Sequence, residues 1–268
     1  MFRSGFLAAI LVASSFAPAS AAPPPAQVDP VGQQVDEDYR REFGVCDRTD
    51  TFRGHAVHGC RDDPNAVTAL RRMPNGTIVY VSKLAVDLDG SPFACSPNHG
   101  AMDQCPTSLM LPDGRGSEVP VDADTIPYVV IPWAGPRDVR GRFTALTGVG
   151  VGDFGYVRYH GATVPVIVAD TGPFEKLGEG SLALHRALGR ELCAARDTKR
   201  VCTRVVDPME SIDGDVVTVL FPGSARSGLT PQTIAQTIRS EVARLRSEAA
   251  RLPQGARRLS TGAGKGRG

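Results

Sequence analysis

The chain has 268 residues and a formal net charge of +1, but the charge is unevenly placed. Residues 224–268 carry eight Arg and one Lys against two Glu, so that the body over residues 22–223 carries −7 once Arg3 is set aside. The field of an acidic body raises the local concentration of cationic ligands and repels nucleic acid. We therefore expect no nucleic-acid partner and favour a cationic substrate; an acidic surface that only maintains solubility is the alternative.

The N-terminus has the pattern of an export signal. Arg3 precedes an apolar run over residues 5–16, and Ala19-Ser-Ala21 fits a cleavage site, which predicts a signal peptide over residues 1–21. The run is shorter than the roughly 20 residues that span a bilayer, and no later segment reaches that length, so we expect no membrane span. The sequence thus predicts a secreted, extracellular protein, with the periplasm as the alternative, and an unstructured leader over residues 22–44.

The cysteines predict disulfides. All six lie in the mature part, and an even count in an exported chain is typical of disulfide bonding. His55 and His58 lie near two of them, but no second Cys-x-x-Cys element completes a zinc site, so we expect no metal and no cofactor. The connectivity stays open. The simplest arrangement joins sequence neighbours: Cys46–Cys60, Cys95–Cys105 and Cys193–Cys202.

Residues 45–222 are long enough for one domain with a substantial core. Short runs rich in β-branched and aromatic residues predict strands, and their spacing favours a barrel or a sandwich. Residues 159–163 predict a hairpin turn, and Ser181 to Gly189 predicts one short helix. The expected strands are residues 77–82, 128–131, 154–159, 164–168 and 215–221.

The pattern changes after Pro222. Residues 223–228 read as a linker, and Thr230-Pro231 is a good helix start, so we expect an amphipathic helix to about Leu252 and a basic, disordered tail beyond it. We expect its apolar face to pack on the core, while its Arg-rich face leaves an anionic partner as the alternative. The apolar face comprises Ile234, Ile238, Val242, Leu245 and Ala249.

Two carboxylates stand at the rims of ordered elements. Asp170 ends the apolar run Val166-Ile-Val-Ala-Asp170, and Glu179 lies between Gly178 and Gly180, just before the predicted helix. Glycoside hydrolysis needs one carboxyl group to protonate the leaving oxygen and a second to act as base or nucleophile. The structural alternatives are a turn residue at Asp170 and a solvated helix-start acid at Glu179.

The chain resembles the chitosanases of glycoside hydrolase family 75. Motifs over residues 82–90, 95–97, 122–130, 169–172 and 178–181 carry the resemblance. It implies that Asp170 and Glu179 form the catalytic pair of an endo-acting enzyme that cleaves chitosan with inversion. It leaves open which carboxyl is the acid and which the base. The sequence departs from the fungal pattern in its Thr171-Gly-Pro173 segment, where many members have Thr-Asn-Gly.

The segments Gly150–Asp153, Tyr156–Tyr159 and Asp170–Pro173 are also similar to double-psi β-barrels of cell-wall lytic enzymes. Together the two resemblances imply a barrel. With the two helices expected from the sequence pattern, the predicted fold is mainly β: a double-psi-like β-barrel with a short helix at the catalytic rim and a C-terminal helix. Two other functions stay open, a peptidoglycan-directed glycosidase or lytic transglycosylase and a non-catalytic cell-wall-binding protein.

A chitosanase would need further carboxylates to hold the ammonium groups of its substrate. We expect substrate-binding roles for Asp87, Asp89, Asp124 and Asp153. Asp87-Leu-Asp-Gly90 also resembles part of a calcium loop, but it lacks the later ligands. Asp124 could equally be a turn acid, and Lys83 could form an ion pair with Asp87 or Asp89.

Overall fold

The structure is a computed structural model of the whole chain. It describes residues 67–96, 104–132, 142–172, 177–206 and 212–251, and the short strands β1 (Gln33–Gln34), β2 (Asp50–Phe52) and β3 (His55–Val57). The expected signal peptide, the Cys46–Cys60 pair and the basic tail lie outside the described residues. β1 lies within the segment expected to be unstructured, where its backbone pairs with the edge of strand β4 (Val67–Arg72).

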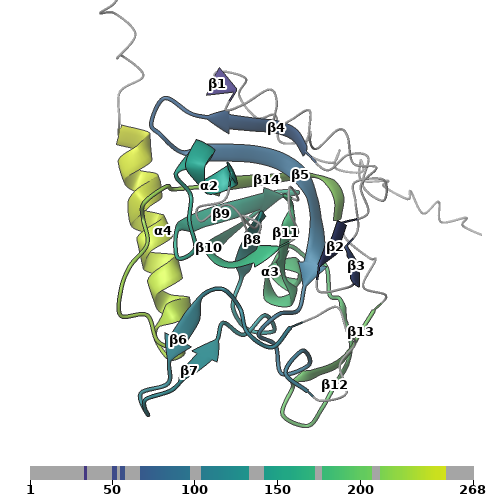
Figure 1. Ribbon diagram of the computed structural model, residues 1–268. Coiled ribbons are helices and arrows are strands. Elements are labelled where there is room, and N and C mark those ends of the chain that lie inside the picture. Colours follow the sequence, from purple (N-terminus) through teal and green to yellow (C-terminus); the bar gives the residue numbers. More distant parts are fainter. Residues whose placement is uncertain are drawn as a thin grey trace, which may run out of the picture.

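The described strands form a closed six-stranded barrel (Figure 1). The ring runs β5–β11–β8–β10–β9–β14 and closes where β14 pairs with β5. β5 is parallel to β11 and β8 is parallel to β10, while the other neighbours are antiparallel. The bounds are β5 Ile78–Asp87, β8 Tyr128–Pro132, β9 Phe154–Tyr159, β10 Ala162–Gly172, β11 Glu179–Ser181 and β14 Ile212–Leu220.

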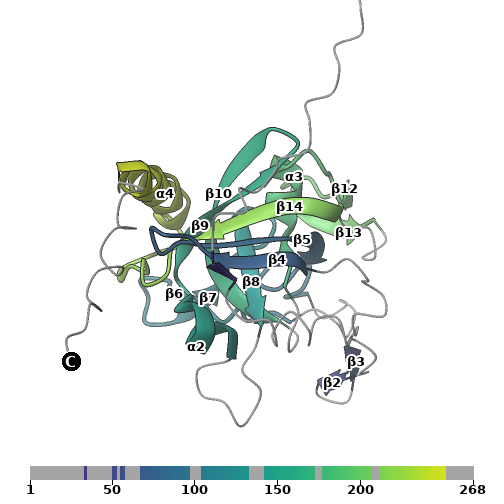
Figure 2. The ribbon, with the colours of Figure 1, turned by 90° about the horizontal axis from the view of Figure 1, so that it is seen from above.

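Smaller elements surround the ring. Two hairpins, β6 (Met110–Pro112) with β7 (Glu118–Pro120) and β12 (Cys193–Arg196) with β13 (Cys202–Val205), project from it. In both ribbon views, β12 and β13 lie on the far side of the barrel from the C-terminal helix (Figure 2). The helices are α2 Arg142–Thr147, α3 Leu182–Ala187 and α4 Ile234–Arg251.

The strands separate two hydrophobic clusters. One cluster contains Tyr80, Val129 and Val168. The other joins the opposite face of β8 and β10 to α4, through residues such as Ile167 and Ile238. A mainly β barrel with a short helix and a packed C-terminal helix confirms the predicted fold class.

Several predicted elements agree closely with the structure. β9 has the predicted bounds, and the predicted hairpin turn contains His160 and Gly161, both with positive φ. α4 starts a turn later than expected and buries Ile234, Ile238 and Val242. The prediction missed β4, α2, the barrel strand β11 and the small strand pairs β2–β3, β6–β7 and β12–β13, because these short segments lack a long apolar alternation. It also ended two barrel strands too early, since β5 continues to Asp87 and β10 to Gly172.

Two of the expected disulfides are present. Cys95–Cys105 closes a loop after β5, and Cys193–Cys202 crosslinks the β12–β13 hairpin. Among the described residues, no helix is both long enough and apolar enough to cross a membrane.

Candidate functional site

The barrel brings Asp170 and Glu179 to the same level of the sheet. Asp170 on β10 and Glu179 on β11 are both register partners of Val130, from opposite sides of β8. Residues paired in this way point their side chains to the same face of a sheet. Since two strand spacings separate them, their Cα atoms lie roughly 9–10 Å apart.

Local backbone features set this arrangement. A β-bulge between Val168 and Asp170 shifts the register of β10, and the Leu109 N–H donates to the Ala169 carbonyl there (2.8 Å). Bulges of this kind re-aim a side chain next to a functional site. Gly178 begins the turn into β11 at φ 83°, and a Cβ at this position would lie 2.3 Å from the Lys83 carbonyl oxygen, so only glycine fits.

Gly172 leaves room for the Glu179 carboxylate. A Cβ on Gly172 would lie 2.7 Å from Glu179 Oε2 and 2.8 Å from Val130 Cγ1. Glu179 is half-buried, whereas Asp170 is 5% exposed. The Glu179 carboxylate therefore lies beside the end of β10, next to the Asp170 segment.

Asp87 and Asp89 complete an acidic cluster with these two residues. Asp87 ends β5, whose residue Ala85 pairs with Glu179, and one carboxylate oxygen of each of Asp87, Asp89 and Asp170 lies within 4.8 Å of the others. The Asp89 N–H donates to Asp87 Oδ1 (2.9 Å), and Asp89 Oδ1 accepts the Gln104 N–H. We call Asp87, Asp89, Asp170 and Glu179 the acidic cluster.

Burial raises the pKa of two members of the acidic cluster. For Asp87, desolvation and then the negative charges of Asp89, Glu179 and Asp170 hold the pKa well above its ordinary value. For Asp170, desolvation also raises the pKa, although hydrogen bonds from Ser108 and Thr171 counteract it. A carboxyl group with a raised pKa keeps its proton to a higher pH and is a stronger base once ionised, which suits it to proton transfer.

Ser108 is a member of the site that the sequence reasoning missed. Its N–H and Oγ–H both donate to Asp170 Oδ1, at 2.9 and 2.6 Å, and its Oγ lies 2.8 Å from Thr171 Oγ1. Ser108 follows the disulfide-bonded Cys105 by three residues but belongs to no motif. No sequence signal identifies it, because the contact spans two distant parts of the chain.

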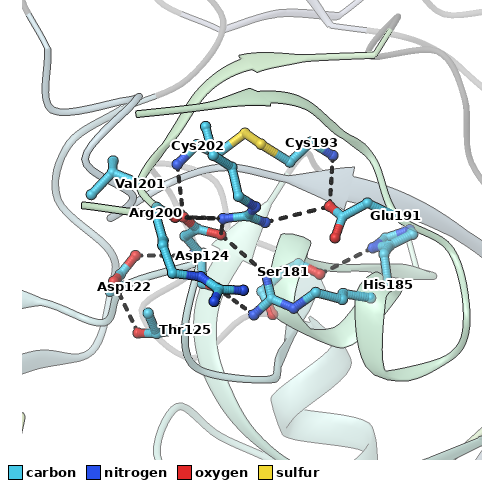
Figure 3. A network of polar contacts seen from close by, with 12 residues as sticks. Asp122, Asp124, Thr125, Ser181, His185, Glu191, Cys193, Arg200, Val201 and Cys202 are labelled. Carbon is cyan, nitrogen blue, oxygen red and sulfur yellow. Dashed lines mark hydrogen bonds and ion pairs between the residues drawn. A yellow bond between two sulfur atoms is a disulfide. The ribbon is translucent and has the colours of Figure 1, made fainter. Parts of the chain in front are cut away.

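Asp124 lies in a different network (Figure 3). It is 4% exposed, and its carboxylate accepts hydrogen bonds from Arg186, Arg196 and the Cys202 N–H. Burial raises the pKa of Asp124, but these donors outweigh it and hold the pKa below its ordinary value. Asp124 therefore has a structural role, because its hydrogen bonds with Arg196 and Cys202 join the β12–β13 hairpin to the barrel.

Asp153 also has a structural role, because its carboxylate binds backbone N–H groups. It is 2% exposed and accepts the N–H groups of Gly150 (2.9 Å), Gly223 (3.1 Å) and Ala225 (2.9 Å). These bonds close the turn before β9 against the chain that follows β14. Of the four residues expected to bind substrate, the structure brings only Asp87 and Asp89 to the catalytic candidates.

The acidic cluster can stabilise a cationic group or exchange protons with a ligand. Three carboxylate oxygens within 4.8 Å of one another could also surround a divalent cation, which prefers oxygen ligands. Asp87 and Asp89 each use one oxygen to accept a backbone N–H, which restricts that geometry. No protein-family model matches the chain, and no curated protein matches it.

Proposed function

We propose that the protein is an endo-acting chitosanase that hydrolyses β-1,4 linkages between glucosamine units with inversion. The observation that carries the proposal is the placement of Asp170 and Glu179 on either side of Val130. The likeness to family 75 chitosanases, which rests on the motifs around these two residues, supports the same reaction.

Inversion is what the family 75 resemblance implies, and it sets the separation expected between the two carboxyl groups. Inverting glycosidases hold their two carboxyl groups roughly 6.5–9.5 Å apart, which leaves room for a water molecule, whereas retaining enzymes hold them about 5–5.5 Å apart. Asp170 and Glu179 have one intervening strand between them. In this mechanism one carboxyl protonates the leaving oxygen while the other accepts a proton from the attacking water.

The acidic cluster also fits the charge of the substrate. Glucosamine units carry ammonium groups, and Asp87 and Asp89 lie beside Asp170, where they could pair with such a group. The charge of −7 on residues 22–223 favours approach of a polycation. Secretion, which the N-terminal sequence predicts, would place the enzyme where polysaccharides occur.

The test measures reducing ends released from chitosan, chitin and peptidoglycan by wild type, Asp170→Asn and Glu179→Gln. We expect wild type to act on chitosan and each variant to lose at least about 100-fold in kcat. Asp215→Asn and Glu118→Gln are matched controls, because both side chains are exposed and lie outside the acidic cluster.

Retained chitosan hydrolysis in both cluster variants would overturn the proposal. Release of muropeptides without action on chitosan would instead identify a peptidoglycan-directed enzyme. Binding to polysaccharide without any rise in reducing ends would identify a wall-binding protein.

A further inference from the structure

Asp170 uses its two carboxylate oxygens differently. Oδ1 accepts three hydrogen bonds, from the Ser108 N–H, the Ser108 hydroxyl and the Thr171 N–H, at 2.9, 2.6 and 2.7 Å. Among the described residues, none donates a hydrogen bond to Oδ2. The carboxylate is therefore held through one oxygen, and the other is left for a ligand or a water molecule.

A short chain of hydroxyl groups supports this arrangement. The Ser108 hydroxyl has one proton, which it gives to Asp170 Oδ1, so the contact between the Ser108 and Thr171 hydroxyls requires Thr171 Oγ1 to be the donor. The Thr171 N–H also approaches Ser108 Oγ (3.1 Å). Hydrogen bonds linked in this way polarise one another, which makes the Ser108 hydroxyl a better donor to a carboxylate.

The backbone keeps Ser108 in place. The neighbouring Leu109 N–H donates to Ala169 at the bulge, and the Thr107 hydroxyl donates to the Leu109 carbonyl (2.7 Å). Upstream, the Gln104 N–H donates to Asp89 Oδ1, and the Gln104 carbonyl accepts the Gly90 N–H (3.2 Å). Ser108 is thus anchored on both sides while its own side chain stays exposed at the border of the acidic cluster.

We propose that Ser108 is a positioning residue that holds Asp170 as a carboxylate through Oδ1 and leaves Oδ2 to accept the proton of the attacking water. The inference rests on the proposed function, and it assigns Asp170 as the general base and Glu179 as the general acid. Donors to the ionised form favour that form, and the opposing effect of burial makes Asp170 a stronger base than an exposed carboxylate.

The test compares wild type, Ser108→Ala and Ser108→Thr, with Ser117→Ala as a control at an exposed serine of the β6–β7 turn. The Asp170 carboxyl is titrated by ¹³C NMR on protein with labelled aspartate, and its resonance is assigned by its loss in Asp170→Asn. Ser108→Ala removes one of three donors, so we expect the titration midpoint to rise by about one to two pH units. Ser108→Thr and Ser117→Ala should titrate close to wild type.

Kinetics on chitosan provide the second measurement. For Ser108→Ala we expect kcat to fall roughly 10- to 100-fold with little change in KM, and the acidic limb of the pH profile to move to higher pH. An unchanged Asp170 midpoint, or a shift of the alkaline limb alone, would overturn the proposal. The NMR midpoint needs no substrate, so it tests Ser108 even if the chitosan assay refutes the proposed function.

Discussion

Asp124→Asn separates a structural role from a substrate-binding role. The two oxygens of Asp124 both accept from donors: Oδ1 from Arg186 and Arg196 (3.2 and 2.9 Å), and Oδ2 from Arg196 and the Cys202 N–H (both 3.0 Å). Asparagine replaces one oxygen with an NH2 group. Whichever way the amide is oriented, a donor then faces a donor, and the negative charge is lost.

The magnitude follows from the partners. An unsatisfied buried N–H costs about 1–3 kcal/mol, and breaking a buried ion pair costs about 3–5 kcal/mol. The side chains of Arg186 and Arg196 are 39% and 25% exposed, so water can satisfy part of what they lose. We therefore expect a loss of about 2–4 kcal/mol in the free energy of unfolding, or roughly 5–15 °C in Tm.

The assay is urea and thermal unfolding followed by circular dichroism, together with KM for chitosan on the folded protein. Because the folded pKa of Asp124 is depressed, its contribution to stability is present above the ordinary value and is lost as pH falls through the folded value. The deficit of Asp124→Asn should therefore be full at pH 7 and shrink below about pH 4. A variant that melts with wild type but has a raised KM would refute this reasoning; Asp215→Asn is the control.

Two further predictions concern the acidic cluster. Gly172→Ala places a Cβ against Glu179 Oε2 and Val130 Cγ1. We expect kcat/KM on chitosan to fall roughly 10- to 100-fold and the free energy of unfolding to fall by about 1–3 kcal/mol. Gly150→Ala is the control and should change neither quantity, because a Cβ at Gly150 would have nothing within 4 Å. Unchanged kinetics in Gly172→Ala would contradict the placement of Glu179. Asp87→Asn keeps the acceptor for the Asp89 N–H and removes a carboxyl group whose burial opposes ionisation, so Tm at pH 7 should rise by about 2–6 °C. Since the folded pKa of Asp87 is raised, wild-type stability falls as pH rises from the ordinary pKa through the folded pKa. The gain in Tm of Asp87→Asn over wild type should therefore vanish near pH 4. A variant less stable than wild type at pH 7 would contradict the destabilising effect assigned to the Asp87 carboxyl group.

Local patterns in the sequence identified much of the barrel. The sequence predicted β9, the hairpin turn after it and the buried face of α4. Each of these depends on a property of a short segment: apolar alternation, a glycine at positive φ and a 3.6-residue apolar period. The sequence did not predict that β14 pairs with β5 and closes the barrel. These strands lie more than 100 residues apart, and their pairing depends on the register of the whole ring.

The acidic residues show the same division. Asp170 and Glu179 could be named from the sequence because each stands at the rim of a recognisable element within a family-like motif. Asp124 and Asp153 have the same residue type, and no local pattern distinguishes them from Asp87 and Asp89. Only the tertiary structure assigns them partners, since Arg196, Cys202 and the chain after β14 are remote in sequence.

By itself, the sequence identified Asp170 and Glu179 as candidates for acid and base chemistry, and it predicted a strand before Asp170 and a helix after Glu179. It did not predict that β10 extends through Gly172 or that Glu179 begins the barrel strand β11. The tertiary structure decided which carboxylates lie near one another. Asp170 and Glu179 both pair with Val130, from opposite sides of β8, and the bulge at Ala169 brings Ser108 to Asp170. The reason is physical: hydrogen-bond patterns and apolar periodicity act over a few residues, whereas charge, burial and proton affinity depend on every group that the fold brings near.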